Sequence, residues 1–356
     1  MVNAVPGPVE VPGALVIGGR FRLRFPVVFV CRHPERWPEL FDGSVWPPTL
    51  DAVHERVVTH EDLTIVQSAV MLAGAGYDVR LAAEPDPAAL NVVSGIDLRI
   101  ADRTANVFVI AFRGDWARPQ LADLTLTMNG SVATRSRETA MPHWIQTGLV
   151  ERDRTREPRI RSLVFKGDLV NLAEAFRSDA VLDELRRRDI GFAAHVFDHT
   201  TRTSGWHDYR DVDAVIAVRD IAAVELATKP ASKLINAWAA GVPALLGVEP
   251  AYRELRVGPL DYIEVSEPGE MLAAIDRLNA DPQLYLAMVQ HGRIRALAYR
   301  RERMVERWVQ YLNGPAAAAF DAWSREPRWK RSVRFGVRAV RQRSENLVFA
   351  RMQSTR

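Results

Sequence analysis

Short apolar runs alternate with helix-length amphipathic segments along most of the chain. In the first half, apolar runs of strand length cover 26–31, 77–81, 91–93, 106–112 and 124–128. Thr59, with Asp62 three residues later, forms a capping box before a helix expected over 63–73. Continuous apolar runs between helices are typical of interior strands in a parallel sheet. The first half is therefore predicted to be an α/β domain.

The same alternation starts again after residues 151–159, a charged segment with a proline that we interpret as a linker. Runs of strand length follow at 160–165, 192–197, 212–218, 242–246 and 262–265. The pattern predicts two successive α/β domains with short additions at each end. The expected boundaries are a loose N-terminal arm (1–20), a first domain (21–155), a second domain (156–315) and a basic helical extension (316–356).

The segment 229–254 (KPASKLINAWAAGVPALLGVEPAYRE) combines a helix, a turn and a buried strand. Pro230 suits the first helical position and Gly241 suits the helix end. At 100° per residue, one face carries Lys229, Lys233 and Asn236. The opposite face carries apolar side chains, which we expect to pack on a sheet: Leu234, Ile235 and Trp238. A helix start with two lysines above it is suited to phosphate.

Lysine is rare in this chain, and its positions change the interpretation of this helix. Among 47 basic residues only four are lysine: Lys166, Lys229, Lys233 and Lys330. The first three stand at an expected strand end or helix start. Lysine binds phosphate as a compact point charge, whereas arginine is a planar fork. We infer a diphosphate site, against the alternative that the lysines form the solvated side of an amphipathic helix.

Further candidates stand at the carboxyl ends of predicted strands, where ligands bind in parallel sheets. The predicted binding residues of the second domain are Lys166, Gly167, Arg219, Lys229, Ser232, Lys233, Asn236, Glu249, Tyr252 and Glu254. Cations there can neutralise a diphosphate, and carboxylates or amides can bind sugar hydroxyls. For the first domain we predict Asp115 and His143 as catalytic residues, with half-buried structural roles as the alternative.

Several classes of site are excluded by the motifs that are missing. The chain has no GxGxxG after a strand, no Walker A sequence, no GxSxG and no CxxC pair. His, Asp and Glu do not cluster at metal-ligand spacing, so no metal is expected, and His54 and His60 are predicted to be surface residues. A single cysteine suits a reducing compartment, and no run of eighteen apolar residues occurs. With 26% charged residues and no signal-peptide pattern, a cytoplasmic globular protein is expected.

The tail from 325 to 356 is strongly basic, with ten Lys or Arg against two acidic residues. Apolar residues recur among the arginines at roughly helical spacing. This pattern is typical of a helix lying on an anionic membrane, here the inner face. It also fits a helix packed on the first domain with a solvated arginine face. Nucleic-acid binding is a third alternative without other support, and we predict no nucleic-acid partner.

The stretch KPASKLINAWAAGVPALLGVEPAYRELR, followed by LDYIEV, resembles the donor-binding half of GT-B glycosyltransferases. The strand ending at Arg219 and the strand ending at Lys166-Gly167 match as well, so the resemblance covers about 157–312. It implies two Rossmann-like domains facing across a cleft, with a nucleotide sugar on the second and the acceptor on the first. It implies sugar transfer to an acceptor hydroxyl without a metal or other cofactor, the nucleotide sugar being a co-substrate.

One departure from the family pattern affects the sugar site. The retaining branch carries E-x7-E, but here the two positions are Thr228 and Asn236. Retention or inversion of the anomeric centre therefore stays open, as do the base, the sugar and the acceptor, whether a glycan, a lipid-linked or a small molecule. Two alternatives also stay open: a nucleotide-sugar epimerase of the same fold, and a non-catalytic scaffold that binds a nucleotide or polyanion.

Overall fold

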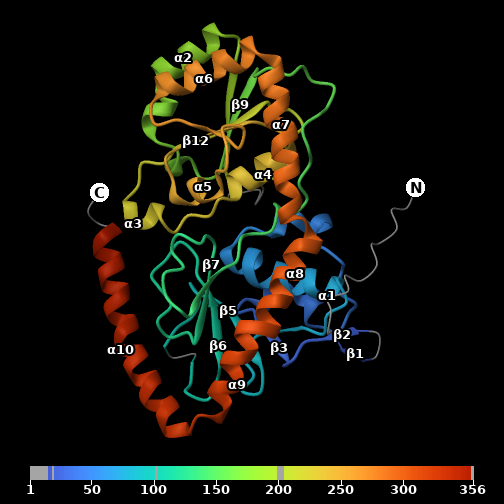
Figure 1. Cartoon of the computed structure of the whole chain (residues 1–356), viewed down its shortest axis with the longest axis vertical. Coiled ribbons are helices and arrows are strands. Elements are labelled where there is room, and N and C mark those ends of the chain that lie inside the picture. The colour runs from blue at the N-terminus through green and yellow to red at the C-terminus, as the bar shows by residue number, and fades with distance from the viewer. Residues whose placement is uncertain (1–14, 18–19, 101–102, 199–203, 354–356) are drawn as a thin grey trace.

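The computed structural model describes residues 15–17, 20–100, 103–198 and 204–353 (Figure 1). Most of the predicted N-terminal arm lies outside these ranges. Its described part forms a small antiparallel pair, β1 (Leu15–Ile17) with β2 (Arg20–Arg22). The rest of the chain builds two parallel sheets, one above the other in Figure 1. The predicted α/β class with two Rossmann-like units is confirmed.

The first sheet has the strand order β4-β3-β5-β6-β7-β8, and every neighbouring pair is parallel. Its strands are β3 (Val27–Val30), β4 (Arg80–Ala82), β5 (Leu90–Ser94), β6 (Val109–Phe112), β7 (Leu124–Thr127) and β8 (Glu138–Ala140). The strand expected at 77–81 begins at Arg80 instead. Strand β8 was not predicted, because this short edge strand carries Glu, Thr and Ala rather than an apolar run.

The second sheet has the order β10-β9-β11-β12-β13 and is also parallel. Its strands are β9 (Ser162–Lys166), β10 (Gly191–His195), β11 (Ala214–Ala217), β12 (Ala244–Leu246) and β13 (Ile263–Glu264). Its helices are α2 (Asp179–Arg187), α3 (Ala223–Leu226), α4 (Ser232–Ala240), α5 (Pro250–Leu255), α6 (Pro268–Ala280) and α7 (Pro282–Ala296). Numbered within its own sheet, the second set of strands runs in the order 2-1-3-4-5, and the first set runs in the same order with a sixth strand, β8, added at the edge.

The chain returns to the first sheet through α8 (Arg301–Tyr311), α9 (Ala317–Arg325) and α10 (Arg328–Gln353) (Figure 1). The Trp308 ring on α8 lies 5.6 Å from that of Phe29 and 6.1 Å from that of Phe112. On α9, the Phe320 ring lies 5.4 Å from that of Phe108. These aromatic contacts bury α8 and α9 against the first sheet, so segments far apart in the sequence share one hydrophobic core.

The predicted capping box starts the helix of the first domain. The Asp62 carboxylate accepts the Thr59 N–H at 2.8 Å, and the Thr59 hydroxyl accepts the Asp62 N–H at 3.2 Å. The first turn is π-helical (Asp62–Val66) and continues as α1 (Gln67–Gly74). Because the cap fixes where this helix begins, it also fixes the position of the preceding residue His60.

Candidate functional site

A cavity of about 300 Å³ lies between the two domains, where the carboxyl ends of both sheets meet. This is the place at which parallel α/β sheets bind ligands, and the volume is at the lower end of the ~300–1,000 Å³ of small-molecule sites. Seven of the predicted site residues line it: Asp115, His143, Lys166, Gly167, Ser232, Lys233 and Asn236. Residues from both halves of the sequence therefore meet in one place.

Helix α4 presents its first turn to this cavity. It begins at Ser232, two residues after the predicted start at Pro230, and its last residue, Ala240, is followed by the C-cap Gly241, whose φ of 73° is left-handed as expected there. Leu234, Ile235 and Trp238 are buried, which confirms the predicted apolar face. No side chain caps the first turn, so its free N–H groups remain available to an anion.

Lys233 is the cation best placed to bind a ligand. Its ammonium has no hydrogen-bond or ion-pair partner among the described residues, and it lies 5.5 Å from the centre of the Phe165 ring. Gly167 leaves room for it, because a Cβ added there would stand 3.3 Å from Lys233 Nζ, and the φ of +143° also favours glycine. Burial, followed by the nearby Arg219 charge, lowers the pKa of Lys233. An anion bound in the cavity would offset both the loss of solvation and the repulsion from Arg219, and would so stabilise the charged form of Lys233.

The other two lysines of this region are occupied by protein groups. Lys166 Nζ donates to the carbonyl oxygens of Gly205 at 3.0 Å and Asp208 at 2.7 Å, which holds the loop after β10. Lys229 Nζ pairs with Asp115 Oδ2 at 2.8 Å and with Glu225 Oε1 at 3.2 Å. The Lys229–Asp115 pair joins the second domain to the first. Direct phosphate contact by these two lysines stays a prediction.

Arg219, Glu249 and Tyr252 form a buried group beside the cavity without lining it. The Arg219 guanidinium pairs with the Glu249 carboxylate, whose side chain is only 1% exposed, and donates to the Tyr252 hydroxyl at 3.4 Å. Burial raises the pKa of Glu249, while the Arg219 and Lys233 charges oppose that rise. The ion pair therefore sets the charge next to Lys233, and its predicted contact with a nucleotide is untested.

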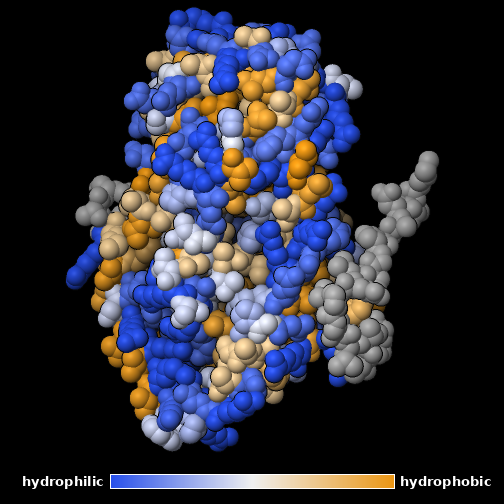
Figure 2. Space-filling model, in the orientation of Figure 1, coloured by the Kyte–Doolittle hydropathy of each residue, from blue (hydrophilic) through white to orange (hydrophobic). Residues whose placement is uncertain are grey.

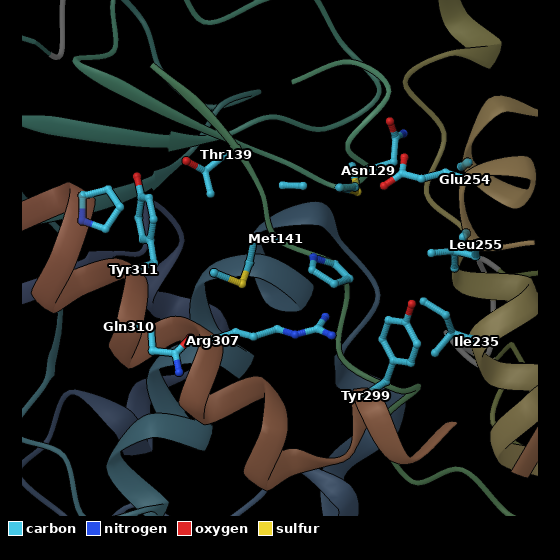
Figure 3. A pocket seen from close by; sticks show the side chains of 16 residues that line it. Asn129, Thr139, Met141, Ile235, Glu254, Leu255, Tyr299, Arg307, Gln310 and Tyr311 are labelled. Atoms are coloured by element: carbon cyan, nitrogen blue, oxygen red, sulfur yellow. The ribbon is translucent and has the colours of Figure 1, made fainter. Parts of the chain in front are cut away.

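Glu254 does not line this cavity. Its carboxylate accepts the N–H of Gly130 at 2.8 Å and that of Ser131 at 2.9 Å, both in the first domain. Figure 3 shows it at the edge of a second interdomain cavity of about 450 Å³, with Arg307 and Tyr311 among the lining side chains. In the structure Glu254 thus connects the domains, and its predicted role in donor binding has no geometric support.

Two imidazoles stand on the first-domain wall of the smaller cavity. His143, predicted as catalytic, has Nε2 2.6 Å from the Met128 sulfur. His60, expected at the surface, lines the cavity instead, with Nδ1 3.1 Å from Ser94 Oγ and a buried Nε2 that has no partner among the described residues. The capping box marks the start of the helix after the first strand, and such starts face the cleft in α/β sheets. The capping box could therefore have placed His60 at the cleft from the sequence alone.

Burial lowers the pKa of each of these imidazoles to about 4. Both rings are therefore neutral near neutral pH. An imidazole with so low a pKa is a weak proton acceptor there. Their side chains fit hydrogen bonding to a polar ligand better than proton abstraction.

We expect anion binding in the cavity to weaken as the pH rises. Burial lowers the pKa of Lys166 to about 7 and also lowers that of Lys233, so both ammonium groups are charged in acid and lose the proton in mild alkali. Isothermal titration with a nucleoside diphosphate from ~pH 6 to ~pH 9 should show falling affinity. In Lys233→Arg the side chain stays charged, and the profile should flatten. An unchanged slope in that variant would contradict the assignment to Lys233.

No group of three or more His, Cys, Asp or Glu side chains that could hold a metal ion occurs in the described residues. Among the helices of that part of the chain, none is long and apolar enough to cross a bilayer.

Comparison of the fold with solved structures identifies it. No family model and no curated protein matches the sequence. Sucrose-phosphate synthase from Thermosynechococcus elongatus matches with a TM-score of 0.53 at 12% identity, covering 83% of this chain and 100% of that one. HepE from Anabaena, solved with UDP and glucose, gives a TM-score of 0.47 at 10% identity over 84% of this chain and 100% of its own.

The TarM structure gives a TM-score of 0.47 at 8% identity and covers 64% of this chain. The chain spans 55% of TarM and 57% of the chain matched in the GtfA/B complex. With its two parallel sheets and the cleft between them, the chain has the GT-B fold of glycosyltransferases, as the motif resemblance predicted.

Proposed function

We propose that the protein is a glycosyltransferase that moves a sugar from a nucleotide-diphosphate donor to an acceptor hydroxyl. One observation carries this proposal: Lys233, half-buried and without an ion-pair partner among the residues that the structure describes, stands at the uncapped start of α4 inside the cleft of a GT-B fold. The charged form of a half-buried ammonium beside free N–H groups is stabilised when an anion binds next to it. A diphosphate is the anion that this combination suits.

The donor diphosphate would be bound by Lys233 and by the first-turn N–H groups of α4, with Gly167 leaving space for it. Asn236 accepts the Gln146 N–H at 2.9 Å, which leaves its amide NH₂ to donate to a sugar or ribose oxygen. When the acceptor oxygen bonds to the anomeric carbon, the bond from that carbon to the diphosphate oxygen breaks. Lys233 then stabilises the charge that develops on the departing diphosphate.

We assign Asp115, rather than His143, as the base that accepts the proton of the acceptor hydroxyl. The low pKa of His143 makes it a weak base. Asp115 instead has one carboxylate oxygen on Lys229 and the other buried without a partner among the described residues. That second oxygen is available to an acceptor hydroxyl that enters from the first domain.

The reaction is proposed to proceed without a metal, because cationic side chains at the site can supply the charge that a metal would. The proposed compartment is the cytoplasm, since the only cysteine, Cys31, is a free buried thiol.

A panel of nucleotide sugars tests the proposal. We expect diphosphate release from one nucleotide series among UDP, GDP, ADP and TDP sugars, slowly with water and faster with acceptor, and equally fast with EDTA. Binding without release would favour the non-catalytic scaffold. Interconversion of the sugar without transfer would favour the epimerase. If the protein binds no nucleotide sugar of the panel, the donor-site assignment is wrong.

A further inference from the structure

Helix α10 packs on the first domain through its polar side. Arg338 pairs with Asp123, and the Gln342 amide accepts the Leu121 N–H at 3.2 Å and donates to the Arg118 carbonyl at 3.1 Å. Gln120 donates to Glu345, the only acidic residue of the helix, at 2.9 Å. One turn further on, Phe349 is buried. These polar contacts, together with Phe349, fix which side of α10 faces the first domain.

The opposite side of α10 exposes a row of large apolar side chains. Trp329 is 65% exposed, Val333 60%, Val340 64% and Leu347 62%. At 100° per residue these four positions fall within about 40° of one another, roughly opposite Arg338 and Gln342. Figure 2 shows apolar side chains along the edge of the molecule where α10 runs. A contiguous exposed stripe of this kind marks an interaction surface in most proteins.

Either a second copy of α10 or a lipid bilayer could cover this apolar row, and the charges beside the row favour one of the two. The exposed charged side chains of α10 are all cationic: Arg328, Lys330, Arg341, Arg343 and Arg351. In a dimer formed by two copies of α10, these cations would face one another and repel. A bilayer with anionic headgroups would accept the apolar row and pair with the cations on either side of it.

We propose that α10 is a membrane-docking helix, which binds an anionic bilayer in the interfacial plane while its polar side stays on the first domain. Its C-terminal part lies near the cleft, because the Phe349 ring packs 5.8 Å from that of Trp116, the chain neighbour of the cavity-lining Asp115. Docking would therefore bring the mouth of the cleft close to the membrane surface. The membrane-docking proposal rests on the exposure and charge of the α10 side chains and does not depend on the proposed sugar transfer.

Vesicle co-sedimentation of the full chain tests this surface. We expect binding to phosphatidylcholine vesicles with about one-third phosphatidylglycerol, weaker binding at high salt, and little binding to phosphatidylcholine alone. The triple variant Val333→Gln, Val340→Gln, Leu347→Gln should lower the partition coefficient ~10-fold or more, because it removes three apolar anchors. Arg341→Gln with Arg343→Gln should weaken binding to the anionic vesicles and reduce its salt dependence.

A matched control replaces three apolar residues that are equally exposed elsewhere. Val45, Val257 and Ile294 are 97%, 70% and 66% exposed, and their glutamine variants should bind vesicles as the parent chain does. Thermal melting and diphosphate release without vesicles should be the same in both triple variants. The proposal is wrong if the parent chain ignores anionic vesicles, or if the α10 variant binds them undiminished. It is also wrong if light scattering shows a dimer that only the α10 variant dissociates.

Discussion

Replacing Lys233 by alanine should lower kcat/KM for donor turnover by ~100-fold or more, which corresponds to a loss of roughly 2.7 kcal/mol of transition-state stabilisation. Lys166 and Lys229 are paired with protein groups, whereas Lys233 has no partner among the described residues. Its ammonium is therefore available to pair with the diphosphate of a ligand. The measurement is diphosphate release from the nucleotide sugar that the panel identifies, together with the affinity for the free nucleoside diphosphate.

The stability of the same variant separates binding from folding. Lys233 stays half-buried at a cost in solvation, since its pKa is lowered mainly by burial. Removing it should leave the melting temperature unchanged or raise it, while activity falls. Arg186→Ala, an exposed cation whose side chain is 69% accessible, serves as the control and should leave both quantities unchanged. Undiminished turnover in Lys233→Ala would show that the diphosphate binds elsewhere.

The second large effect is expected on stability, from the buried pair of Arg219 and Glu249. Their side chains are 5% and 1% exposed, and the guanidinium also donates to Tyr252. In Arg219→Met, the Glu249 carboxylate would remain buried without its partner. We expect the free energy of unfolding to fall by ~3–5 kcal/mol. Urea denaturation followed by far-UV circular dichroism measures this change.

A double variant shows whether the loss comes from the unpaired charge. Arg219→Met combined with Glu249→Leu removes both charges, and most of the lost stability should return. If Arg219 also contacts the donor, the double variant would be stable and still poorly active. A single variant as stable as the parent chain would mean that water or another group compensates Glu249, and the pair would not be a structural element of the cleft.

Local sequence was sufficient for several features of the site. The Thr59–Asp62 capping box, the left-handed Gly241 and the apolar face of α4 all formed as predicted, because each depends on residues within one or two helical turns. The alternation of strands and helices was enough to predict two parallel α/β units, and the GT-B arrangement of the two came from the motif resemblance. Of the three lysines at predicted strand or helix ends, Lys166 and Lys233 line the cavity between the domains.

The partners of the charged residues depended on the tertiary structure. Lys229 lies 114 residues from Asp115 in the chain, so no local pattern could show that a carboxylate would occupy it. Lys166 is held by carbonyls of a loop some 40 residues further along, and Glu254 caps N–H groups of the other domain. Only the fold showed that, of these three lysines, Lys233 is the one without a hydrogen-bond or ion-pair partner in the described part of the chain.

Helix α10 shows most clearly the difference between what the local sequence determines and what the tertiary structure determines. Its sequence determined that one side would be apolar and the other polar, since that follows from helical periodicity alone. Periodicity does not say which side a helix turns toward its neighbour. That was decided by the surface it meets, where Asp123, Gln120 and the Leu121 N–H require polar partners. The polar side therefore packs inward, and the apolar row is left facing outward.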